Sequence, residues 1–143
     1  MTTTKEMHDT DLRNVLKNDG VNSVAVGDFE NRPTVGLGEL QDHFGVESWA
    51  ARVFYNERFG GVLIRQSPGE GNRLHYHPDA DECWVILEGE WEWYIENEGT
   101  RTVREKDIIV VRKGVRHQIK CIGSKPGIRL AITAPDVDHV YAE

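Results

Sequence analysis

Three histidines and one glutamate in this chain are ligand types for a metal ion, and their spacing allows them to meet. His75 and His77 are two residues apart, so an extended strand would direct both imidazoles to the same face. Glu82 follows after a short turn, and His117 must come from a second strand. Imidazole suits zinc, copper, iron and nickel, and a carboxylate widens the choice towards iron and manganese. The sequence therefore predicts one metal ion bound by these four side chains.

The segment that carries the first three ligands resembles the first motif of the cupin superfamily. In that motif a glycine precedes a His-x-His pair, a glutamate follows the pair, and a second glycine closes the segment. These places are occupied here by Gly69, His75, His77, Glu82 and Gly89.

The second cupin motif is matched less completely. Gly114 and His117 agree with it, whereas Lys106, Arg112 and Cys121 stand where the family has glycine, proline and asparagine. These departures concern the geometry of turns, and the histidine ligand itself is present.

The resemblance covers roughly residues 61–133 and implies both a fold and a cofactor. The implied fold is an all-β, double-stranded β-helix (jelly-roll) cupin barrel. The implied cofactor is one divalent metal ion, with iron expected for activity and zinc, manganese or nickel as alternatives. The metal ligands implied by the family are His75, His77, Glu82 and His117. By resemblance to small cupins, a homodimer is also expected.

Short β-type segments separated by Gly, Pro and Asn run from Trp49 onwards and indicate a β-sandwich or barrel. We expect two hairpins, one turning at residues 56–60 and one at Gly89. A single pair of motifs predicts one barrel domain at residues 46–143. The expected strands are 50–55, 61–67, 83–88, 90–96, 101–104, 107–112, 118–122 and 128–133.

Residues 1–45 are interpreted as an N-terminal arm with one or two helical turns, which packs on the barrel or on a partner subunit. Asp11 can cap a first helix, and residues 37–44 predict a second that ends at Gly45. Residues 84–87 and 108–111 are apolar on both faces, so their outer faces need a cover from the arm or a second subunit.

The predicted lining of the metal pocket follows from the alternation of side chains along strands. Trp84 shares a face with Glu82, and Trp91 and Trp93 share the less polar face of the next strand. They either form a wall against the substrate or simply fill the barrel. Arg73 precedes His75 by two residues and either holds an anionic group of the substrate or is solvated. His139 and the remaining histidines are interpreted as ordinary surface or core residues.

Three functions are compatible with this site. Four protein ligands on an octahedral ion leave two positions for water, substrate or dioxygen, which favours an Fe(II)-type oxygenase of a small organic molecule. The same ion could act as a Lewis acid in an isomerase, cyclase or lyase, with Glu82 as the catalytic base. The third alternative is a metabolite- or sugar-binding cupin without turnover, and a tetrahedral zinc with four protein ligands would be inert.

The composition of the sequence indicates which partners, which location and which state of the cysteines to expect. The net charge of −7 argues against a nucleic-acid partner, which requires a basic surface. The sequence has no apolar run of the ~20 residues needed to span a bilayer and no signal-peptide core, so a cytoplasmic protein is expected. Cys83 and Cys121 provide no disulfide framework, and their strand positions point to different environments, so both are expected to be reduced.

Overall fold

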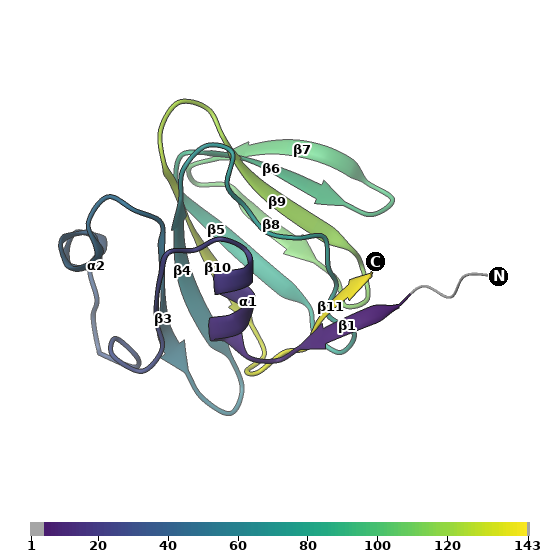
Figure 1. The fold of residues 1–143 in the computed structure, drawn as a ribbon, viewed down its shortest axis with the longest axis horizontal. Coiled ribbons are helices and arrows are strands. Elements are labelled where there is room, and N and C mark those ends of the chain that lie inside the picture. The colour runs from purple at the N-terminus through teal and green to yellow at the C-terminus, as the bar shows by residue number, and fades with distance from the viewer. Residues whose placement is uncertain (1–4, 143) are drawn as a thin grey trace.

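The computed structural model describes residues 5–142 as a β-structure with two short helices (Figure 1). The elements in chain order are β1 (Glu6–Asp9), α1 (Leu12–Asn18), β2 (Ser23–Ala25), α2 (Leu37–Phe44), β3 (Trp49–Tyr55), β4 (Gly60–Gln66), β5 (Glu82–Glu88), β6 (Glu90–Ile95), β7 (Gly99–Arg104), β8 (Ile108–Val111), β9 (His117–Ile122), β10 (Gly127–Thr133) and β11 (His139–Ala142).

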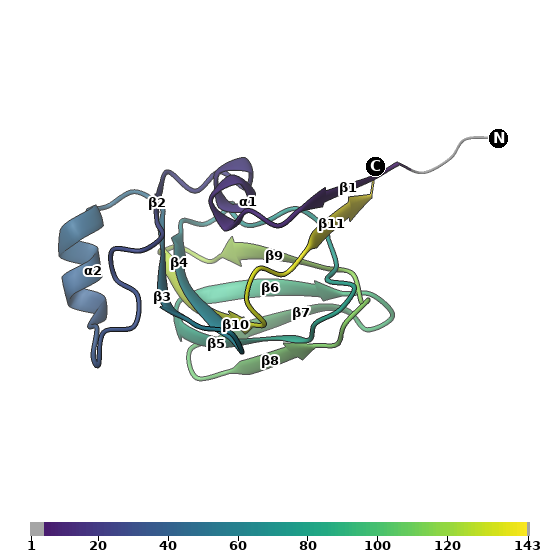
Figure 2. The same ribbon diagram turned by 90° about the horizontal axis from the view of Figure 1, so that it is seen from below.

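Two sheets enclose a common interior. The larger has the strand order β2-β3-β4-β10-β5-β8, and the smaller has the order β7-β6-β9. Side chains from both sheets meet in one apolar cluster, in which Trp84 and Ile86 of β5 pack with Trp91 and Trp93 of β6. A third, two-stranded sheet joins β1 to β11 on the side of the barrel away from α2 (Figure 2). The arrangement is the expected all-β jelly roll.

The eight strands expected between residues 50 and 133 are present with small shifts at their ends. The hairpin at residues 56–60 is confirmed, because β3 and β4 pair antiparallel across it. The hairpin predicted at Gly89 is wrong. There β5 pairs with β10 and β8, whereas β6 pairs with β7 and β9 in the other sheet.

Gly89 therefore turns a corner between the two sheets. Its φ is +81°, and a Cβ at this position would lie 2.7 Å from the Cα of Gly127. The sequence signal for a tight turn was correct, but a turn residue alone does not determine whether the strands that it joins pair with each other.

The N-terminal segments contact the large sheet and the C-terminal strand. The Asp11 carboxylate caps α1 by accepting from the backbone N–H groups of Arg13 and Asn14. Leu16 of α1 packs on the large sheet, and Leu40 of α2 is fully buried in a cluster with Trp49. Strand β2 extends the large sheet by parallel pairing with β3. Neither helix described is long and apolar enough to cross a membrane.

The outer face of β8 has no cover among residues 5–142. Ile108 is 70% exposed and Val110 is 59% exposed. The outer face of the neighbouring strand β5 is less exposed, because Leu87 packs against the α2 cluster while Cys83 and Val85 are half-buried. The cover expected for the 108–111 segment is thus not supplied by the part of the arm that the structure describes.

Candidate metal centre

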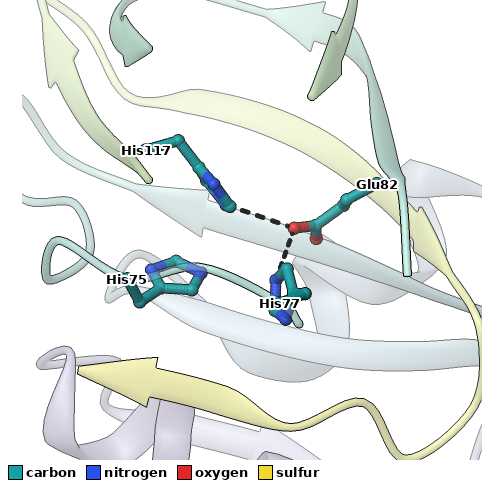
Figure 3. Close-up of side chains that lie close together, drawn as sticks. All are labelled: His75, His77, Glu82 and His117. Atoms are coloured by element: carbon teal, nitrogen blue, oxygen red, sulfur yellow. Dashed lines mark hydrogen bonds and ion pairs between the residues drawn. The ribbon is translucent and has the colours of Figure 1, made fainter. Parts of the chain in front are cut away.

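The four predicted ligands come together at the wall of the barrel interior (Figure 3). One ligand atom from each lies within 4.8 Å of the ligand atoms of the others, and all four residues are buried. His75 and His117 are fixed to each other through their backbones, since each N–H donates to the other's carbonyl at 3.1 and 2.8 Å. The pairing of the loop before β5 with β9 explains why ligands 42 residues apart in sequence converge.

Backbone carbonyls set the orientation of each histidine ring. The Nδ1 atoms of His75, His77 and His117 lie 2.7, 2.9 and 3.1 Å from the carbonyl oxygens of Arg73, Asp138 and Val115, respectively. A carbonyl oxygen can only accept a hydrogen bond, so Nδ1 of each ring carries the proton. This arrangement leaves the Nε2 atoms to bind a cation, which is how outer hydrogen bonds commonly orient metal-binding histidines.

Glu82 supplies the negative charge of the cluster. Its Oε1 lies 2.9 Å from His77 Nε2 and 3.4 Å from His117 Nε2. Burial alone would raise the pKa of this carboxyl, but His117 and His77 outweigh that effect and hold it well below its ordinary value. Glu82 is therefore ionised, as a metal ligand must be.

The environments of the three histidines also suit the binding of a cation. Burial, together with the charges of His117 and His139, lowers the pKa of His75 well below its ordinary value, so this ring is neutral. The pKa of His77 is raised, because the hydrogen bond to Glu82 outweighs the lowering effect of burial. His117 Nε2 is buried without a hydrogen-bond partner. A metal ion would replace the proton shared by His77 and Glu82 and would also satisfy His117. The donor set of three imidazoles and one carboxylate fits such an ion.

The cluster opens onto a cavity of about 80 Å³, large enough for several waters or a small organic molecule. His75, Glu82 and Trp84 line it, as does His139 on β11. The His139 ring stacks on His75 at a centroid distance of 5.1 Å and an interplanar angle of 26°, and burial lowers its pKa to about 4. The interpretation of His139 as an ordinary residue missed this position, because nothing in its surrounding sequence signals that β11 crosses the site.

The four residues predicted to bind substrate occupy different environments. Trp84 lines the cavity and packs edge-on against His117 at 5.3 Å. Trp91 and Trp93 are fully buried and are not among the cavity-lining residues. Arg73 donates to the Asp19 carboxylate at 2.7 Å and to the Tyr141 hydroxyl at 3.0 Å. A direct contact with substrate stays a prediction for all four, and the geometry favours it most for Trp84.

One further residue of the cavity was not selected from the sequence. Arg129 of β10 is 2% exposed and lines the cavity that Glu82 and His75 also line. The available signal was an arginine between Ile128 and Leu130 in an otherwise apolar strand. A charged residue is seldom fully buried without a specific reason.

Comparison with known proteins agrees with this architecture. The chain is similar to an uncharacterized conserved protein with a double-stranded β-helix domain from Klebsiella pneumoniae (TM-score 0.65, 21% identity, 78% of this chain and 96% of the other). It is also similar to TT1209 from Thermus thermophilus (TM-score 0.63, 23% identity, 73% and 98%) and to KdgF from Halomonas sp. (TM-score 0.55, 17% identity, 60% and 78%). At these identities the likeness shows the fold alone.

Sequence comparison identifies the family. The uncharacterized protein YdbB from Bacillus subtilis (strain 168) is 33% identical over 46 residues, which are 32% of this chain and 41% of the length of that relative. The profile of the Cupin domain family matches residues 62–133, almost the span over which the cupin motifs were recognised. The match covers half of the chain and includes all four residues of the cluster. The chain therefore belongs to the cupin family.

Proposed function

We propose that this protein is a mononuclear, metal-dependent cupin enzyme, an Fe(II)-type oxygenase acting on a small organic molecule. The observation that carries the proposal is the set of three Nε2 atoms, from His75, His77 and His117, directed with the Glu82 carboxylate at one point beside a cavity. Iron bound by these residues would supply redox chemistry towards dioxygen.

The surrounding residues would perform the tasks that such chemistry requires. The carbonyls that accept from the histidine Nδ1 atoms hold the rings in place, so the donor set is preorganised. Trp84 and Ile119 provide apolar surface beside the ligands, which limits access of bulk water. His139 offers a polar ring at the cavity for orienting a substrate.

The alternative enzyme class is a non-redox isomerase, cyclase or lyase with Glu82 as a catalytic base. The lowered pKa of Glu82 keeps the carboxylate ionised and makes it a weak base, which favours a binding role over proton abstraction. Binding of a metabolite or sugar without turnover is the third possibility. The polar groups at the cavity, including His139 and Arg129, are compatible with such binding.

Metal analysis of protein purified under anaerobic conditions, followed by measurement of dioxygen consumption with a panel of small organic acids and phenols, tests the proposal. We expect one iron per chain and substrate-dependent consumption that is lost in Glu82→Gln. The matched control is Glu92→Gln, because Glu92 alternates with the inward tryptophans of β6 and is absent from the cavity lining. A colourless zinc protein that consumes no dioxygen would contradict the oxygenase assignment.

We also propose that the partner of this chain is a second copy, which covers the outer face of β8. Cys83 and Val85 of β5 lie opposite Val110 and Ile108 in the strand register, so the four side chains share one outward face. Ile132 of β10 extends this face, since it lies opposite Cys83. Strand β8 is also an edge strand, whose free backbone groups can pair with another strand.

The oligomeric state in solution tests this second proposal. Val110→Lys should shift the protein from dimer to monomer in analytical ultracentrifugation, because a charge would be buried at the interface. Val46→Lys is the matched control, as Val46 is 85% exposed and lies outside this face. A monomeric wild-type protein, or a dimer unaffected by Val110→Lys, would exclude the interface.

A further inference from the structure

Arg129 carries a buried charge that residues 5–142 leave nearly unpartnered. A guanidinium has five N–H donors, and here one hydrogen bond is formed, from Nη1 to Oε1 of Gln66 at 2.6 Å. Nε is buried and has no acceptor. The planar guanidinium lies over the Trp91 ring, 4.8 Å from the ring centroid. The ring covers one face of the guanidinium but provides no negative charge.

Two other arginines close to the cavity differ in this respect. Arg52, which lines the cavity, pairs with Glu30 at 3.1 Å, and Arg73, which lies behind the lining residue Asp19, pairs with that carboxylate at 2.7 Å. Among the residues that the structure describes, no carboxylate lies within 4.0 Å of the Arg129 guanidinium. A buried charge without a counter-ion opposes folding strongly.

The environment keeps Arg129 in one place and charged. Gln66 is 1% exposed, and its Nε2 donates to the Gly71 carbonyl at 2.9 Å, so its Oε1 is fixed towards the guanidinium. Burial lowers the pKa of Arg129 to about 10, with Asp19 and Glu82 opposing that effect. At neutral pH the side chain still bears its positive charge. The register of β10 against β5 shifts between Ile128 and Arg129, a local irregularity of the kind that redirects side chains near functional sites.

We propose that Arg129 anchors a carboxylate group of the ligand, whose other end reaches the metal centre. This inference rests on the proposed metal-dependent function and specifies its substrate class as small organic acids. Arg129 and two of the proposed metal ligands, His75 and Glu82, line the same cavity, so this cavity gives one bound molecule access to both. A carboxylate matches the planar donor fork of arginine and would supply the counter-charge that β10 and its neighbours lack.

Calorimetric titration of the zinc-loaded protein tests the anchor without the complication of redox chemistry. The probes are malonate, succinate and glutarate, each compared with its monoamide, which has nearly the same shape and one charge fewer. We expect at least one diacid to bind about tenfold or more tightly than its monoamide, the range for a charge-assisted hydrogen bond. Equal affinities of all three pairs for the wild-type protein would overturn the proposal, and this comparison needs no variant.

Variants then assign the effect to one residue. Arg129→Gln should abolish the preference for the diacid, while Arg129→Lys should retain part of it. Arg73→Gln tests the rival anchor, and the preference for the diacid should survive it, because Arg73 lines no part of this cavity and already has a carboxylate partner. If Arg73→Gln removes the preference and Arg129→Gln keeps it, the anchor is Arg73, as the sequence predicted, and the assignment to Arg129 is wrong.

Separate measurement of metal content distinguishes this inference from the proposed function. A wild-type protein that binds no metal would count against the proposed function. Arg129 would then be tested in that protein with propionate and propionamide, where equal binding would overturn the anchor. A zinc-loaded protein indifferent to ligand charge would contradict the anchor and leave the metal site intact.

Discussion

Two groups of buried side chains differ sharply in chemistry, although they share the barrel interior. The aromatic group is apolar, with Trp91, Trp93 and Cys121 fully buried and Ile119 nearly so. The polar group comprises nearly all the buried polar side chains of residues 5–142. Apart from Ser48, these are Gln66, His75, His77, Glu82, His117 and Arg129.

This difference separates the source of stability from the source of chemistry. Burying aromatic side chains stabilises the fold, because it removes large apolar surfaces from water. Burying histidines, a glutamate and an arginine opposes folding unless they find partners. A barrel can carry the second group because the first group stabilises it. Trp84 links the two groups, since it packs against both Trp93 and His117.

The largest effect on stability is expected in the aromatic group. Trp93→Ala should lower the free energy of unfolding by ~3–5 kcal/mol, as for other buried tryptophans, while the folded fraction still binds one metal ion. Urea denaturation and metal analysis measure the two quantities. Tyr94→Ala is the control, since Tyr94 is the next residue of β6 and is 38% exposed. A variant of normal stability that has lost its metal would refute this division.

A smaller effect is expected in the polar group, where it should depend on the metal. In the wild-type protein, metal at a hundredfold excess over its dissociation constant should raise the unfolding free energy by about 2.7 kcal/mol. In His75→Ala and His117→Ala this increase should vanish, and metal content should fall. His43→Ala, at an exposed histidine of α2, should behave as wild type. Unchanged metal content in both ligand variants would show that the cluster is not the binding site.

The smallest effect concerns the rates at which a thiol reagent modifies the two cysteines, and it leaves the free energy of unfolding unchanged. Both are free, Cys121 within the aromatic group and Cys83 half-buried on the outer face of β5. In Val110→Lys, where no partner should cover β5, a thiol reagent should modify Cys83 first and Cys121 only after unfolding. Burial raises the pKa of both thiols, so exposure decides the order of reaction. Equal rates of modification of the two thiols in the folded variant, or a Cys83–Cys121 disulfide detected by mass spectrometry, would contradict this expectation.

The sequence predicted the ligands and most strands because these depend on local spacing. His75 and His77 share a face by simple alternation, and the motif around Glu82 is specific. Even where the second motif departs from the family, the geometry survives. Lys106, which stands in place of a glycine, adopts a φ of +78°, a left-handed conformation that glycine takes more easily.

The features that the sequence did not reveal depend on contacts between distant segments. The corner at Gly89 needs the pairing partners of β5 and β6, which turn chemistry alone does not specify. His139 enters the site because the neighbouring Val140 of β11 pairs with Tyr76, which lies between two ligand histidines, and the sequence gives β11 a weak strand signal. The sequence could not show that Arg129 lacks a counter-ion, since a carboxylate could have come from any part of the chain. The positions of β10 and its neighbours are needed to see this.

The most direct test of the central claim is a crystal structure of metal-loaded protein with anomalous data collected above and below the absorption edge of the metal. The account predicts one anomalous peak per chain, bounded by the Nε2 atoms of His75, His77 and His117 and by the Glu82 carboxylate. A peak elsewhere on the protein, or no peak at this position in crystals of protein with one metal per chain, would contradict the account.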